Sequence, residues 1–329
     1  MSFKNSYARI AKIIALSLIL TVSMVIISGF VVPMDGVQSS ASTGDDGRIV
    51  LLLWIVNAVN AFLISLVVLQ TEWRGWSLVL GLSLAFYGVQ TVVGQIEAIV
   101  FLTPLGENWG AGSIPALTMP LDFITSQFIV GAVQAAIGVP AAVLLFGRQK
   151  EDRKGNQVHL ESRMGFRQWL VKAALIVVLY ILLYFGFGYF VAWKSPAVQT
   201  FYQGTDPGSF LAQMENVVRE TPTLIPFQAL RGLLWMGFSY PLVRMLRDQK
   251  WWGALLTGLF LSLPMNIPHI VPNPYMPADV RLVHFIETAS SMFIFGMLLF
   301  WLLHRSHPNP AAFIKRQKAR GDQHTVSTP

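Results

Sequence analysis

Five ionisable side chains and one threonine interrupt stretches of sequence that are otherwise apolar. They are Glu97, Arg231, Arg281, His284, Glu287 and Thr288. Ionisable groups inside apolar segments are costly to bury, and they mark binding sites or ion pairs. Arginine suits an anionic group, whereas carboxylates beside an imidazole suit protons or cations. The sequence therefore predicts an outward-facing polar pocket that binds or transports a small solute or ion.

Four of these residues follow one another in a single segment near the C-terminus. Arg281, His284 and Thr288 are spaced i, i+3 and i+7 and so share one face of a helix, with Glu287 three residues after His284. A purely structural role is the competing interpretation. In that case Glu97 or Glu287 pairs with an arginine, and His284 bonds within the bundle.

A metal site is another alternative, because imidazole and carboxylate groups bind zinc and a glutamate can act as general base on bound water. Its candidate ligands are His269, His284, Glu97 and Glu287. The H-x-x-x-N spacing of His269 and Asn273 resembles one motif of the CAAX-type intramembrane proteases, whose paired Glu-Glu-x-x-x-Arg motif is missing here. A metal-dependent intramembrane hydrolase and a non-catalytic accessory or sensor protein are the alternative functions. No nucleotide or dinucleotide motif names a cofactor, so the cofactor stays unknown.

The elements that must position these residues are long apolar segments. The chain of 329 residues is 53% hydrophobic and 12% charged, about half the charged fraction of soluble domains. Eight blocks are long enough to cross a bilayer as helices. They are 11–33, 48–70, 76–102, 123–147, 168–193, 227–247, 251–271 and 280–304. The predicted fold is an all-α integral membrane protein with eight transmembrane helices.

The net charge of +7 is distributed unevenly along the chain. With a cytoplasmic N-terminus, the cytoplasmic segments hold nineteen of the 24 Lys and Arg residues, and the outer side holds five. This positive-inside asymmetry predicts that both termini are cytoplasmic in a bacterial-type inner membrane. It accounts for the basic charge with the lipid bilayer as partner and without nucleic acid.

An internal repeat organises the helices. Segments 119–148 and 276–305 match at nine of thirty positions, both begin Met-Pro-x-Asp, and both end in arginine. Weaker matches relate the preceding helices at offsets of 160 and 176. We expect two parallel four-helix repeats, 1–148 and 168–305, joined by a basic linker, 149–167, and followed by a disordered tail, 306–329.

The two copies differ where the chemistry is expected. Arg281, His284, Glu287 and Thr288 align with Ile124, Gln127, Val130 and Gly131, respectively. The scaffold common to both copies therefore needs no charge at these positions. The differences favour an activity placed in the second copy.

Three further features concern the connections and the first helix. Five prolines between 264 and 277 predict a broken backbone near His269. Asp206 as N-cap and Pro207 at the first helical position predict an amphipathic surface helix, lying on the protein or on lipid or closing a cavity as a lid. The first block follows a basic start and could be a signal segment cleaved near 40–42, but its length favours a retained helix.

Overall fold

The computed structural model describes residues 3–33, 46–103, 119–150, 165–202, 204–273 and 275–304. Every regular element in these ranges is a helix, as the apolar blocks predict. The long helices of the first half are α1 (Phe3–Val31), α2 (Asp46–Gln70), α3 (Gly75–Tyr87), α4 (Val93–Leu102) and α6 (Leu121–Leu145). Those of the second half are α8 (Phe166–Phe190), α11 (Leu224–Met245), α12 (Lys250–Asn266) and α13 (Ala278–Leu303). Two further helices, α9 (Pro196–Phe201) and α10 (Phe210–Glu220), lie between α8 and α11.

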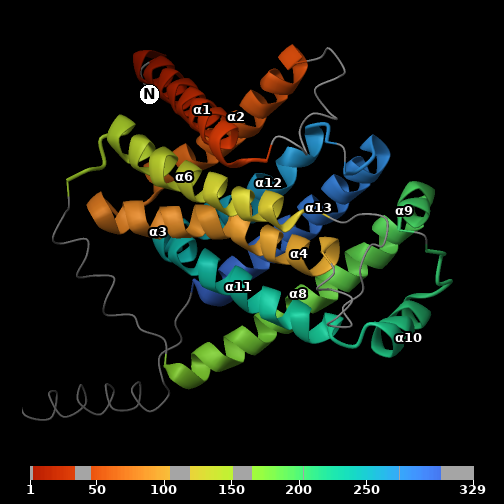
Figure 1. Cartoon of the computed structure of the whole chain (residues 1–329). Coiled ribbons are helices and arrows are strands. Elements are labelled where there is room, and N and C mark those ends of the chain that lie inside the picture. The colour runs from red at the N-terminus through yellow and green to blue at the C-terminus, as the bar shows by residue number, and fades with distance from the viewer. Residues whose placement is uncertain are drawn as a thin grey trace, which may run out of the picture.

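The helices pack as two groups that meet along the middle of the molecule. In the first group α1 packs against α2 and α6, and α3 packs against α6; in the second, α8 packs against α11 and α13, and α12 packs against α13. The groups meet where α3 contacts α11 and where α2 contacts α12. Figure 1 shows α1 and α2 at one end of this arrangement and α8 and α11 at the other.

Seven helical segments among the described residues are long and apolar enough to cross a membrane. They account for seven of the eight predicted blocks. The remaining block forms α11, which has 22 residues but lower hydropathy because it contains Gln228, Arg231 and Pro241. The polar side chains of α11 are buried against its neighbours. The chain is thus an all-helical, multi-pass membrane protein.

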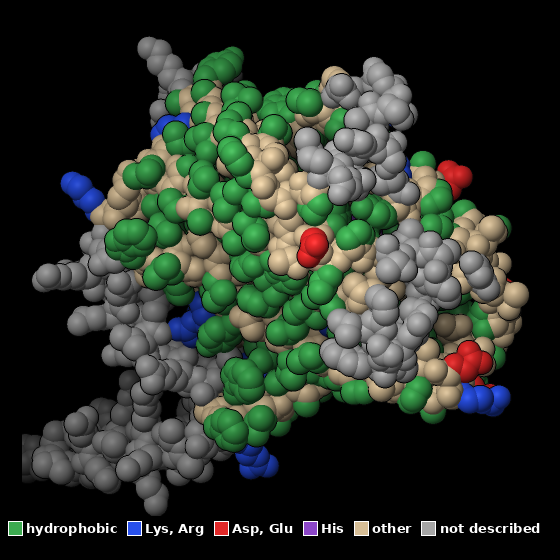
Figure 2. Space-filling view, viewed as in Figure 1, with side chains coloured by type: hydrophobic (Ala, Val, Ile, Leu, Met, Phe, Trp, Pro, Cys, Tyr) green, Lys and Arg blue, Asp and Glu red, His purple; other side chains and the backbone are tan. Residues whose placement is uncertain are grey.

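The outer surface of the bundle is largely apolar. Hydrophobic side chains are spread over much of the face drawn in Figure 2, with few charged groups among them. The exposed apolar side chains of the bundle include Leu182 on α8 and Leu80 on α3, with 62% and 65% of their surface exposed. Apolar surface of this extent is what a bilayer requires of a spanning bundle.

The third block is not a regular helix throughout. A single π-helical turn, Gly88–Val92, separates α3 from α4. Gln90 in this turn donates to Gln134 of α6, which in turn donates to Asn57 of α2. Asn57 of α2 is therefore hydrogen-bonded to another helix. The buried side-chain amide of Asn60, one turn later, has no partner among the described residues.

The predicted break near His269 is confirmed. The α-helix α12 ends at Asn266, and a 3₁₀ turn, Ile267–Ile270, follows it. Pro264 is accommodated inside α12, so the break falls two residues later than the first proline. This interruption leaves backbone carbonyls near His269 without helical partners.

The predicted start of the surface helix at Asp206 is wrong. The helix α10 begins at Phe210, and the side chain of its N-cap, Ser209, accepts from the Ala212 amide. Gly208, at φ +80°, reverses the chain before the helix can start. The Asp206 carboxylate instead accepts from the Gly208 amide and from Lys194.

Several sequence-based predictions lie outside the described residues. These are the cleavage position at 40–42, most of the linker 149–167, and the tail 306–329.

Candidate functional site

Four of the six predicted binding residues line one cavity of about 40 Å³ between α4, α8, α11, α12 and α13. They are Glu97, Arg231, Glu287 and Thr288. Tyr180 and Tyr184 of α8 and Ser291 of α13 complete its polar lining. A volume of this size exceeds the roughly 10–15 Å³ that one water molecule needs. The cavity therefore has room for a small ion or for water.

The Glu97 and Arg231 side chains form a two-pronged ion pair at one side of this cavity. Arg231 Nη1 donates to Glu97 Oε1 at 2.7 Å, and Nη2 donates to Oε2 at 2.5 Å. The Arg231 side chain is 3% exposed and that of Glu97 is 31% exposed. Bidentate pairing of this kind fixes both groups in orientation as well as in charge.

The rest of the Arg231 guanidinium is enclosed by helix side chains. Nη1 also donates to Gln228 Oε1 at 3.0 Å. The rings of Tyr180, Tyr184 and Phe227 lie 5.8–5.9 Å from the guanidinium carbon, within the range of a cation–π interaction. Arg231 Nε and Gln228 Nε2 have no partner among the described residues although both are buried. The described protein groups leave these two nitrogen atoms without a hydrogen-bond acceptor.

Glu287 reaches the cavity from α13 and is held by its neighbour one turn earlier. His284 Nδ1 lies 2.9 Å from Glu287 Oε2, and His284 Nε2 lies 2.8 Å from the Tyr202 hydroxyl. A neutral imidazole with its proton on Nδ1 satisfies both contacts, because it donates to the carboxylate and accepts from the tyrosine. Tyr202, His284 and Glu287 thus form a continuous polar chain from the segment after α9 to the cavity.

Tyr202 belongs to a segment that covers the N-terminal end of α13. Val198 of α9 and Val280 of α13 are buried in the same small apolar cluster. The Tyr202 ring also contacts the His284 ring edge-on, with 5.6 Å between centroids. Burial raises the pKa of Tyr202, with the charge of Glu287 as the next cause. The hydroxyl therefore stays protonated and able to donate.

Hydroxyl groups lie beside the two carboxylates. Thr288 Oγ1 lies 2.5 Å from Asn266 Oδ1, at the end of α12, and 2.5 Å from the His284 carbonyl oxygen, so its single proton is shared between these two acceptors. Ser291 Oγ donates to the Thr288 carbonyl at 3.1 Å. Each hydroxyl oxygen keeps lone pairs that can accept or coordinate.

Arg281 and His269 do not line this cavity. Arg281 Nε donates to the His269 carbonyl at 3.1 Å, and Nη1 donates to the Met276 carbonyl at 2.6 Å. His269 Nδ1 bonds to the Asn266 carbonyl. Arg281 therefore satisfies backbone carbonyl groups in the irregular segment between α12 and α13, and its role is structural.

The predicted metal ligands are divided among separate contacts. Glu97 pairs with Arg231, His284 with Glu287, and His269 with backbone. Within the described ranges, no three His, Asp or Glu side chains gather as a metal-binding group.

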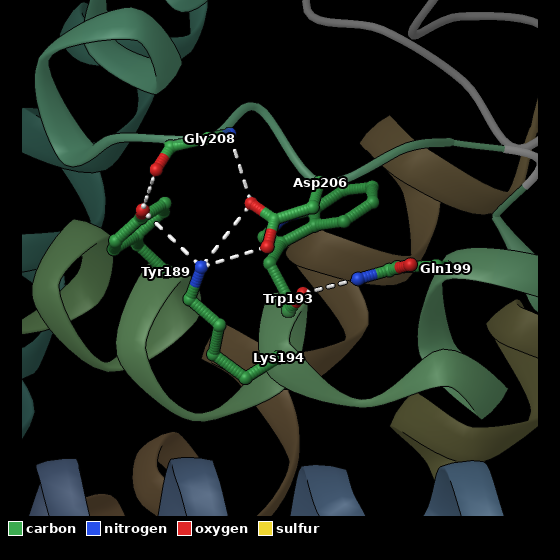
Figure 3. Close-up of polar contacts among 6 residues, drawn as sticks. All are labelled: Tyr189, Trp193, Lys194, Gln199, Asp206 and Gly208. Atoms are coloured by element: carbon green, nitrogen blue, oxygen red, sulfur yellow. Dashed lines mark hydrogen bonds and ion pairs between the residues drawn. The ribbon is translucent and has the colours of Figure 1, made fainter.

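A second polar cluster, drawn in Figure 3, holds the segment between α8 and α10 in place. Lys194 Nζ donates to both Asp206 carboxylate oxygens, at 2.9 and 3.1 Å, and to the Tyr189 hydroxyl at 3.2 Å. The Tyr189 hydroxyl donates to the Gly208 carbonyl. The Lys194 ammonium, by its hydrogen bond, lowers the pKa of Asp206, and the Gly208 amide adds to this effect. We call these four residues the Lys194 clamp.

The sequence analysis does not identify four residues of this region. Tyr180 and Tyr184 look like ordinary lipid-facing aromatics in an apolar segment, yet they flank Arg231. Tyr202 lies in a loop whose path the sequence does not indicate. Only Gln228 has a signal that could have found it, because its position three residues before Arg231 places both on one face of a helix.

Comparison with known proteins adds no relative: no family model, no curated protein and no solved structure matches this chain.

Proposed function

We propose that this protein is an eight-helix membrane protein of two parallel repeats that binds a small monovalent cation, of the Na⁺ class, in the cavity beside Glu287. The single observation that carries the proposal is the convergence of Glu97, Arg231, Glu287 and Thr288 on one cavity. Binding is the first step of transport, and an ion-coupled membrane function in the bacterial inner membrane, with both termini cytoplasmic, follows from the same proposal.

Helix bounds support the repeat. Moved by 157 residues, α6 falls on 278–302, and α13 is Ala278–Leu303. Moved by 176 residues, α2 falls on 222–246, and α11 is Leu224–Met245. Moved by 160 residues, α1 falls on 163–191, and α8 is Phe166–Phe190. These offsets come from sequence identities alone, so agreement in helix bounds is independent support for the two halves, 1–148 and 168–305, and for α11 as an eighth span.

A polar contact supports the same correspondence. Gln90 and Asn266 are 176 residues apart, and each bonds to the last helix of its own half. Gln90 donates to Gln134 of α6, and Asn266 accepts from Thr288 of α13. Gln134 aligns with Ser291 and not with Thr288, so in the proposed scheme the second half makes this contact one turn earlier along its last helix.

Charge favours a cation over an anion. Glu97 and Glu287 outnumber Arg231 among the cavity residues, so the formal charge of the lining is −1 with His284 neutral. Both Nη groups of Arg231 are already committed to Glu97, and Arg281 is committed to backbone carbonyls. Neither arginine therefore has a free pair of guanidinium N–H groups with which to bind an anionic ligand.

Size and ligand type favour a small ion. The accessible space of about 40 Å³ is far below the 300–1,000 Å³ typical of sites for drug-sized molecules. Carboxylate and hydroxyl oxygens from Glu287, Thr288 and Ser291 are the donors that hard cations prefer. The proposed ligand is accordingly a monovalent cation with most of its water removed.

The test is the thermal unfolding midpoint of the purified full-length chain in a series of chloride salts. Li⁺, Na⁺ and K⁺ are compared with choline, which is too large for the cavity, at constant ionic strength. We expect saturable stabilisation by one small cation, equivalent to about 2.7 kcal/mol at 100 times its Kd. Glu287→Gln removes the saturable part, whereas Glu215→Gln, an exposed carboxylate on α10, retains it. Equal stabilisation in all four chloride salts, or none at all, contradicts the proposal.

A further inference from the structure

We propose that α10 is seated on the bilayer, with Leu211 and Val218 inserted at the boundary between lipid headgroups and acyl chains. This inference is independent of the proposed cation site. It rests on how the apolar face of α10 is divided between protein and surroundings.

The apolar face of α10 is only half covered by protein. Phe210, Met214 and Val217 turn toward the bundle, and Val217 is buried. Leu211 and Val218, seven residues apart on the adjoining edge of the same face, are 79% and 60% exposed. Beyond them lie Glu215 and Arg219, which pair with each other in the exposed zone. Around the helix, a protein-facing side is followed by an exposed apolar edge and then by a charged edge. This arrangement is typical of a helix that lies in the membrane–water interface.

The position of α10 along α8 gives its depth. Phe210 stacks on Phe190 with 5.9 Å between ring centroids and 13° between planes, and it also contacts Tyr189. The membrane-spanning segment that contains α8 extends to Lys194, so Phe210 lies four to five residues inside its end, roughly 6–8 Å at 1.5 Å per residue. Interfacial helices bury their apolar face about 5–10 Å into the same zone.

The exposed edge of α10 continues a surface that already faces lipid. Val178, Leu182 and Phe190 of α8 are 54%, 62% and 65% exposed along the membrane span. The Phe190–Phe210 stack joins that stripe to Leu211. A protein partner is not needed to explain apolar surface that extends the lipid-facing side of a spanning helix.

The Lys194 clamp holds α10 in this position against the end of α8. It ties Asp206 and Gly208 to the end of α8, and the chain then turns at Gly208 into the N-cap of α10 (Figure 3). The helix itself carries Glu215, Arg219 and Glu220, a formal charge of −1. Anionic lipids therefore gain nothing from it, and the proposed partner surface is zwitterionic lipid.

The chain contains no cysteine, so single cysteines can be introduced without background. Spin labels at Leu211→Cys and Val218→Cys are compared with Asn216→Cys, an exposed position on the opposite face, in the full-length chain in phosphatidylcholine nanodiscs. Accessibility to oxygen, which concentrates in lipid, is measured against accessibility to a water-soluble nickel chelate.

We expect labels at 211 and 218 to favour oxygen severalfold over the nickel chelate, and the label at 216 to show the reverse. Equal nickel accessibility at all three positions would place α10 in water and overturn the proposal. Protection of 211 and 218 from both reagents would show that protein, such as a second copy of the chain, covers the edge, and it would also overturn the proposal.

Discussion

Arg231 donates one hydrogen bond from each Nη to a different carboxylate oxygen of Glu97, although the two residues are 134 positions apart in the chain. The pair joins α11 of the second half to α4 of the first. It neutralises one of the two glutamates at the cavity and leaves Glu287 as the carboxylate held by a histidine. The chemistry that we propose depends on this division of roles.

Because Arg231 is more deeply buried than Glu97, we predict that removing Glu97 costs more stability than removing Arg231. Glu97→Gln leaves Arg231, which is 3% exposed and cannot lose its proton, without a counter-charge. We expect this change to cost about 3–5 kcal/mol, the usual loss when one partner of a buried pair is removed. Arg231→Met should cost less, because Glu97 is 31% exposed and can accept a proton.

The double variant Glu97→Gln, Arg231→Met is the control for this prediction. It removes both charges together, so it should be more stable than the Glu97→Gln single variant. Thermal unfolding of the four proteins in one detergent measures the cycle. Additive losses would show that the two side chains do not act as a pair.

The polar chain at Tyr202 predicts a modest and specific effect. Tyr202→Phe keeps the ring contact with His284 but removes the hydroxyl hydrogen bond. We expect a loss of about 0.5–1.5 kcal/mol in unfolding free energy. Tyr7→Phe, at a residue that is 71% exposed, should change nothing and serves as the matched control. An unchanged midpoint for Tyr202→Phe would exclude a stabilising bond.

Because α12 and α13 pack closely at Gly296, we predict that adding a single methyl group there destabilises the protein. A Cβ at Gly296 would lie 2.8 Å from the Gly258 Cα and 2.9 Å from the Thr257 carbonyl oxygen, both backbone atoms. Gly296→Ala should therefore cost about 1–3 kcal/mol by overpacking. Gly186→Ala, in α8 with nothing within 4 Å of its Cβ, should be neutral or slightly stabilising. Equal midpoints for the two variants would contradict the close packing.

The Lys194 clamp predicts an acid-induced release of the loop before α10. The folded-state pKa of Asp206 is lowered, chiefly by the hydrogen bond from Lys194. The clamp is therefore fully formed above the unfolded pKa, near 3.9, and is lost as the pH falls through the lower folded value. A spin label at Thr205→Cys should become mobile in that range. Adding Asp206→Asn should make the label mobile at every pH, and a line shape that stays rigid would contradict the clamp.

The sequence predicts the helices well because a membrane imposes length and apolarity on each of them. It also predicts that Glu97, Arg231, Glu287 and Thr288 belong together, since ionisable groups in apolar segments must find partners. It cannot choose between Glu97 and Glu287 as the partner of Arg231. That choice depends on how α4 and α11 cross, which no local pattern encodes.

Other features escape the sequence for local reasons. The turn Gly88–Val92 is π-helical without a residue that demands it. Arg281 looked like a ligand, but the prolines after α12 expose carbonyls that compete for its guanidinium. Asp206 and Pro207 are residues typical of a helix start. The helix nevertheless begins at Phe210, because Asp206 pairs with Lys194 and the chain turns at Gly208.

The central claim is that the cavity takes a cation at Glu287. The most direct measurement is anomalous diffraction from crystals of the full-length chain soaked separately in Tl⁺, which mimics a monovalent alkali cation, and in bromide. We predict a Tl⁺ peak in the cavity in contact with Glu287 and Thr288, absent from Glu287→Gln crystals. A bromide peak beside Arg231, with no Tl⁺ in the cavity, would contradict the claim.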